Sequence, residues 1–111
     1  MKIYLASIAT SEYDIENRVY KNICNSLEYI YDNLKSLSAE FIEGCDFFDR
    51  KYVQEYFTEE FFTQFNGKMN CKSAYGEFSI IKMSDSKYQF VFVPLLSIQF
   101  VVCELEILDL L

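Results

Sequence analysis

The sequence predicts an α+β domain in which N-terminal helices pack on one face of a C-terminal antiparallel sheet. Up to about residue 65, apolar residues recur at steps of three and four, which is the period of a buried helix face. From Ala74 onward the period shortens toward two, and residues that favour strands dominate. With 111 residues and no Pro- or Gly-rich linker, we expect residues 1–111 to form a single domain.

The first predicted helix covers residues 11–36, with Ser11 as its N-cap. Residues 2–8 before it suit either a short strand or earlier turns of the same helix. The apolar stripe that predicts the helix consists of Ile15, Val19, Ile23, Leu27, Ile30 and Leu34.

A second helical stretch is predicted over residues 49–65 and ends at Asn66 and Gly67. Thr58 is followed by two glutamates and resembles a fresh N-cap, so two short helices with a kink between them also fit. The ladder that predicts the buried face consists of Val53, Phe57, Phe61 and Phe65. An additional strand around residues 39–43 is compatible with the pattern.

A three-stranded meander is predicted after residue 74. Its first two strands form a hairpin, with a turn at residues 84–86 and a second strand over residues 88–96. Pro94 indicates a bend, bulge or edge before the third strand. In that third strand Cys103 and Leu105 alternate with Glu104 and Glu106, as in a half-buried antiparallel strand.

The composition argues against catalysis. The chain has no histidine, so a Cys–His or Ser–His dyad and a histidine-containing metal site are excluded. Its four cysteines form no CxxC pair, and no glycine-rich phosphate loop is present. We therefore expect a protein that is not an enzyme and has no cofactor or metal, with reduced and mostly buried thiols.

The sequence also bears on the compartment. The short apolar run at residues 3–9 soon meets acidic residues, which does not resemble a secretory signal, and polar residues interrupt the apolar region 88–103. We expect a cytoplasmic protein.

The charge is strongly acidic, with 17 Asp and Glu against 10 Lys and Arg, a formal net charge of −7. Residues 1–66 hold 12 of these carboxylates and six of the basic residues. This field repels nucleic acid and anionic membranes and favours a basic protein partner. The same charge also serves solubility in a small domain that has 11 Phe and nine Tyr.

One stretch combines carboxylates with aromatic rings. Tyrosine offers rigid contact area and cation–π attraction, while carboxylates pair with Lys and Arg. Adjacent phenylalanines such as Phe61 and Phe62 cannot both face the core of one helix, so some aromatic surface is left for a partner. The predicted partner-binding residues are Asp46, Asp49, Tyr52, Glu55, Tyr56, Glu59 and Glu60.

In size, acidity and the stretch YVQEYFTEE over residues 52–60, the chain resembles immunity proteins of bacterial polymorphic toxin systems, including contact-dependent growth inhibition. The resemblance is one of type and carries over no residue role. It implies a non-catalytic inhibitor that covers the active site of a basic toxin domain, commonly a nuclease.

Two alternatives stay open. The order of helices and terminal meander also resembles the cone-shaped NTF2-like fold, which implies a small-ligand-binding protein or enzyme. A structural subunit that pairs with its own copy through the last strand is a third interpretation, so the expected state is a monomer or weak homodimer.

Overall fold

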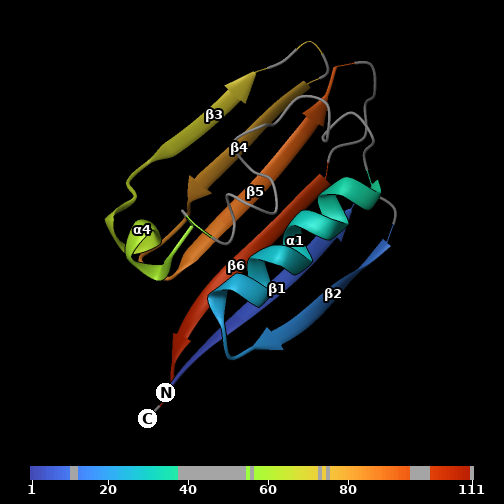
Figure 1. Cartoon of the computed structure of the whole chain (residues 1–111). Helices are drawn as coiled ribbons and strands as arrows, with labels where there is room; N and C mark the ends of the chain where they lie inside the picture. Colours follow the sequence, from blue (N-terminus) through green and yellow to red (C-terminus); the bar gives the residue numbers. More distant parts are fainter. Residues whose placement is uncertain are drawn as a thin grey trace.

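A computed structural model describes residues 1–10, 13–37, 55, 57–72, 74, 76–95 and 101–110. Within these ranges the fold is α+β, as expected, with a six-stranded antiparallel sheet and two helices (Figure 1). In chain order the elements are β1 (Lys2–Thr10), β2 (Tyr13–Tyr20), α1 (Ile23–Leu37), α4 (Glu59–Gln64), β3 (Lys68–Lys72), β4 (Gly76–Lys82), β5 (Lys87–Pro94) and β6 (Val101–Asp109).

The strand order across the sheet is β2-β1-β6-β5-β4-β3. The first two strands form one hairpin, the last four form a meander, and β6 joins the two halves by pairing with both β1 and β5. The proposed pairing of two copies through the last strand is therefore wrong, because β6 lies inside the sheet and has no free edge.

The predicted helix over residues 11–36 is wrong in its first half. Residues Tyr13–Tyr20 form β2, which pairs with β1, and α1 begins only at Ile23. Asn22 starts the helix, since its side-chain oxygen accepts a hydrogen bond from the backbone N–H of Cys24 at 2.7 Å. Ser11, the expected cap, lies outside the described residues.

Several other expectations about elements are settled. The segment 2–8 belongs to a strand, β1. The hairpin with its turn at residues 84–86 is confirmed as β4 and β5, and Pro94 is the last residue of β5. β3 was not predicted, so the meander has four strands instead of three. The suggested strand at residues 39–43 lies outside the described residues.

The core lies on one face of the sheet, and α1 crosses β1 and β6 on that face (Figure 1). The register places Leu105 of β6 between Ala6 of β1 and Tyr88 of β5, and all three side chains are buried. The alternation predicted for β6 is confirmed. The core residues are Tyr4, Ala6, Ile8, Leu27, Ile30, Leu34, Phe57, Phe62, Phe78, Ile80, Tyr88, Phe90, Phe92, Cys103 and Leu105.

Neither helix of the described ranges is long and apolar enough to cross a membrane. Cys103 is buried, whereas Cys24 and Cys71 are half-buried. Cys45 falls outside the described residues.

Candidate functional site

The structure describes three of the seven predicted partner-binding residues. Glu55, Glu59 and Glu60 lie at or just before α4, whereas Asp46, Asp49, Tyr52 and Tyr56 fall outside the described residues. The short helix α4 and its flanks are therefore the part of the candidate site whose geometry can be followed.

Thr58 starts α4, as its sequence context suggested. Its hydroxyl oxygen accepts a hydrogen bond from the backbone N–H of Phe61 at 3.2 Å. Glu59 and Glu60 occupy the first turn, where their negative charges interact favourably with the unpaired N–H groups of the helix. The local sequence thus fixes both where the helix begins and where its two carboxylates lie.

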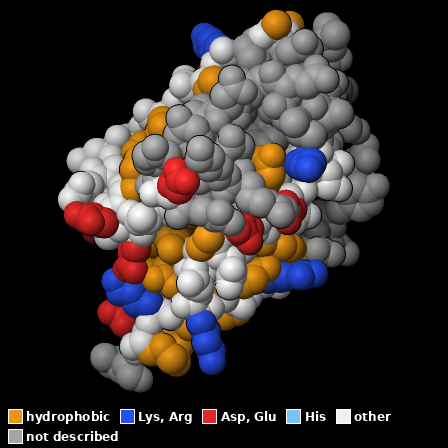
Figure 2. All heavy atoms as spheres, in the orientation of Figure 1, with side chains coloured by type: hydrophobic (Ala, Val, Ile, Leu, Met, Phe, Trp, Pro, Cys, Tyr) orange, Lys and Arg blue, Asp and Glu red, His pale blue; other side chains and the backbone are white. Residues whose placement is uncertain are grey.

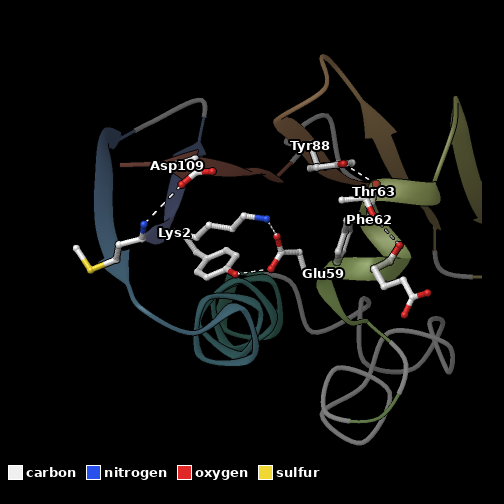
Figure 3. A network of polar contacts seen from close by, with 9 residues as sticks. Lys2, Glu59, Phe62, Thr63, Tyr88 and Asp109 are labelled. Atoms are coloured by element: carbon white, nitrogen blue, oxygen red, sulfur yellow. Dashed lines mark hydrogen bonds and ion pairs between the residues drawn. The ribbon is translucent and has the colours of Figure 1, made fainter. Parts of the chain in front are cut away.

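The side chain of Glu59 links α4 to β1 (Figure 3). Its carboxylate accepts a hydrogen bond from the Tyr4 hydroxyl at 2.8 Å and forms an ion pair with the ammonium of Lys2. Hydrogen bonds from Lys2 and then Tyr4 hold the pKa of Glu59 below its usual value. Burial, aided by the bond to Glu59, raises the pKa of Tyr4 to about 12.

A second anchor lies on the other side of α4. The fully buried ring of Phe62 packs against Tyr88 and Phe90 of β5, at centroid distances of 5.0 and 6.2 Å. The Tyr88 hydroxyl donates a hydrogen bond to the backbone carbonyl of Phe62 at 2.5 Å (Figure 3). Although it has only six residues, α4 is held by contacts to two separate strands.

The apolar ladder predicted from the sequence selected the wrong phenylalanines of α4 for the buried face. Phe61 and Phe65 are half-buried, and the fully buried ring belongs to Phe62 instead. The helix begins at Glu59, so the ladder does not continue through one long helix. Of the adjacent pair, Phe62 is fully buried, whereas Phe61 is half-buried and packs against the margin of the core, on Phe57 at 5.0 Å.

What remains accessible on α4 is a mixed acidic and aromatic surface. Glu55, four residues before the helix, and Glu60 are exposed, and the Glu60 carboxylate accepts a long hydrogen bond, 3.4 Å, from Gln64. The half-buried rings of Phe61 and Phe65 stack at 5.9 Å. We call these four residues the α4 surface.

The described residues offer little for metal or nucleophilic chemistry. None of the groupings of Asp, Glu and Cys in these ranges brings three side chains together as metal ligands. Burial raises the pKa of the Cys103 thiol to about 12, and burial followed by the nearby Glu28 raises the pKa of Cys24. Both thiols therefore stay protonated near neutral pH, in the unreactive form.

Sequence reasoning missed the three residues that hold the site in place. Lys2 and Tyr4 reach Glu59 across more than 50 positions of sequence, and Tyr88 reaches Phe62 across 26. Local periodicity carries no information on such distant partners. A weak signal existed for Tyr88, because a buried tyrosine hydroxyl usually finds a hydrogen-bond partner.

Comparisons with protein-family models, with curated proteins and with solved structures found no match to this chain. Figure 2 shows that carboxylates and basic side chains are interspersed with hydrophobic ones over the described part of the face it presents. The features of the chain that bear on its function are the acidic and aromatic α4 surface and the net charge of −7.

Proposed function

We propose that this protein is a non-catalytic inhibitor, of the immunity-protein type, that binds a basic toxin domain in the cytoplasm and covers its active site. The observation that carries the proposal is the α4 surface, which combines the exposed side chains of Glu55 and Glu60 with the half-buried, stacked rings of Phe61 and Phe65. A nuclease is the class of toxin that fits best, since its site must attract phosphates and is therefore basic.

The firm attachment of α4 to the sheet supports this proposal. Binding surfaces gain affinity when their anchor residues are ordered before the partner arrives. Glu59 is engaged with Lys2 and Tyr4, and Phe62 with Tyr88, so the helix backbone is fixed at both of these residues. In this proposal Glu59 positions the helix, while Glu55 and Glu60 face the partner.

The net negative charge of the chain also supports the proposed inhibitor function. A net charge of −7 steers a basic partner toward the protein over long distances, and the effect weakens as salt screens it. The proposed contact set is completed by Asp46, Asp49, Tyr52 and Tyr56, which extend the same acidic and aromatic composition along the chain.

The alternative of an NTF2-like ligand-binding protein or enzyme has less support. That resemblance rested on helices preceding a meander, but the β1–β2 hairpin comes before α1. A catalytic pocket of that kind would need a buried carboxylate, and the buried polar side chains of the described residues are those of Ser26 and Ser79.

The experiment is a capture of partners with tagged protein at low and high salt, followed by purification of the captured protein and an assay of its nuclease activity. We expect a basic partner whose activity is lost when the inhibitor is added in equal amount. Stopped-flow measurement should show that the association rate falls steeply as salt rises.

Two matched variants make the test specific. Glu60→Lys should weaken inhibition at least about tenfold, because it places a repelling charge within the contact. Glu106→Lys changes the net charge equally but lies on the opposite face of the sheet. Because the new lysine lies opposite Lys87, its fold is first checked by circular dichroism, and the folded variant should inhibit nearly as well as the parent protein. Equal loss in both variants, or a captured partner that keeps its activity, contradicts the proposal.

A further inference from the structure

The described sheet has two edges, β2 and β3, and they differ in charge pattern. An edge strand offers unpaired N–H and C=O groups to any strand of matching sequence. β3 is five residues long, and its two end residues, Lys68 and Lys72, are exposed. β2 has eight residues and exposes Asn17, Arg18 and Val19, the last with 62% of its surface accessible.

Antiparallel pairing with a second copy is unfavourable at β3. A two-fold axis through its central residue, Asn70, places Lys68 of one copy opposite Lys72 of the other. Like charges at directly opposite positions destabilise a strand pair. These lysines therefore protect that edge against self-association.

β2 differs from β3 because its two halves carry opposite charges. Asp14 and Glu16 come before Asn17, and Arg18 and Lys21 come after it, so residues 13–21 carry no net charge within a chain of net charge −7. In antiparallel pairing about Asn17, the acidic half of each strand meets the basic half of the other. The strand itself therefore adds no like-charge repulsion to the contact.

We propose that two copies of this protein pair through β2, antiparallel, about a two-fold axis at Asn17. In that register Glu16 of each copy lies opposite Arg18 of the other, and Ile15 lies opposite Val19. The guanidinium of Arg18 lies 4.8 Å from the centroid of the Tyr29 ring in α1, so this cation is held on the face of the sheet that α1 covers.

The β1–β2 pairing shifts in register between Ile8 and Thr10, a bulge or irregularity that interrupts the ladder near the start of β2. Regular pairing is therefore short, and the dimer should dissociate on dilution. β2 and α4 lie on opposite sides of the fold in Figure 1, so each copy keeps its α4 surface accessible. This inference does not depend on the proposed function.

Sedimentation over a wide concentration range tests the pairing, and charge exchange tests its register. We expect Glu16→Arg and Arg18→Glu each to raise the dimer dissociation constant by on the order of tenfold, since each turns two attractive pairs into repulsive ones. The double variant, which restores both pairs, should recover the parent value. Circular dichroism of each variant confirms that it is folded.

Cross-linking provides an independent test. Residues directly opposite in antiparallel strands have Cα atoms about 4.5–5.5 Å apart, within the range that a disulfide spans. Asn17→Cys should therefore form a covalent dimer on mild oxidation. Val19→Cys, two residues along the same strand and also exposed, should not, because the two copies of position 19 lie far from each other.

Some outcomes overturn the proposal. A protein that sediments as a monomer at every concentration has no such pairing. Cross-linking through Val19→Cys and not Asn17→Cys overturns the stated register, as does a double charge variant that fails to recover. A dimer unaffected by all β2 substitutions places the contact elsewhere and overturns the proposal as well.

Discussion

The hydroxyl of Tyr88 donates a hydrogen bond to the backbone carbonyl of Phe62 at 2.5 Å, and both side chains are fully buried. The bond joins the central part of the sheet to α4 in a place that water does not reach. A buried carbonyl without a hydrogen-bond partner is costly. Removing the hydroxyl oxygen of Tyr88 should therefore lower the stability of the fold.

Tyr88→Phe should lower the free energy of unfolding by about 1–2 kcal/mol, because the ring still packs but the Phe62 carbonyl loses its partner. Urea denaturation measures the change. Tyr20→Phe is a suitable control, since Tyr20 is only half-buried and packs beside Tyr29 at 5.9 Å. A loss as large in the control would argue against a specific role for the buried bond.

Phe62→Ala should cost about 3–5 kcal/mol, because it leaves a cavity beneath α4. The neighbouring Phe61→Ala should cost only about 1–2 kcal/mol, because a half-buried ring loses less transfer free energy. If Phe62→Ala does not fold, Phe62→Leu keeps the comparison measurable by thermal or urea unfolding. An equal cost at the two positions would contradict the observed difference in burial.

The network around Glu59 predicts acid sensitivity. Its pKa in the folded protein is below the ordinary 4.5, so the carboxylate stabilises the fold above that pH, and the contribution is lost as pH falls through the lowered value. Urea denaturation across pH should show the parent protein losing stability below pH 4.5 more steeply than Glu59→Gln.

Exposed Glu60 provides the matched comparison for this acid response. Glu60→Gln makes the same chemical change next to Glu59 but leaves the contacts to Lys2 and Tyr4 in place. Its pH dependence should follow that of the parent protein. If Glu59→Gln and Glu60→Gln respond alike, the coupling to β1 makes no net contribution to stability.

Gly76 permits a close approach between β4 and the end of β5. A Cβ atom at this position would lie 2.5 Å from the backbone oxygen of Val93 and 2.8 Å from the Phe92 ring. Gly76→Ala should therefore destabilise the fold by about 1–3 kcal/mol through overpacking. Gly67→Asn serves as a control, because that position has open space and Asn tolerates its positive φ of 81°.

The meander was predictable because its strands carry their own signal. In β6, buried Cys103 and Leu105 alternate with the more accessible Glu104 and Glu106, and the polar turn after β4 marks the hairpin. These patterns are local, so the sequence alone is sufficient to identify them. The second half of the first predicted helix succeeded for the same reason, since Leu27, Ile30 and Leu34 are all buried.

β2 was missed because two periods coincide in it. Ile15 and Val19 lie four residues apart and continue the stripe of α1 backward, which favoured a helix. The same residues also alternate with Asp14, Glu16 and Arg18 at the period of a strand. Pairing with β1, a tertiary effect, decided between the two patterns.

The candidate site was predictable only in composition. Thr58, Glu59 and Glu60 were correctly placed at a helix start, because capping depends on neighbouring residues. The separation of Glu59 from the exposed Glu55 and Glu60 was not foreseeable, since it depends on Lys2 and Tyr4 from the other end of the chain.

The central position of β6 has a consequence for how the chain reaches its native state. β1 and β6 pair along their full length, from Lys2 beside Asp109 to Thr10 beside Val101. During synthesis the β1–β2 hairpin is made first, but β1 joins the rest of the sheet only through β6, the last strand to be made. Until then the hairpin is isolated, and an isolated hairpin is only marginally stable. Contacts between residues so distant in sequence slow folding, so this sheet should form slowly for a chain of its length.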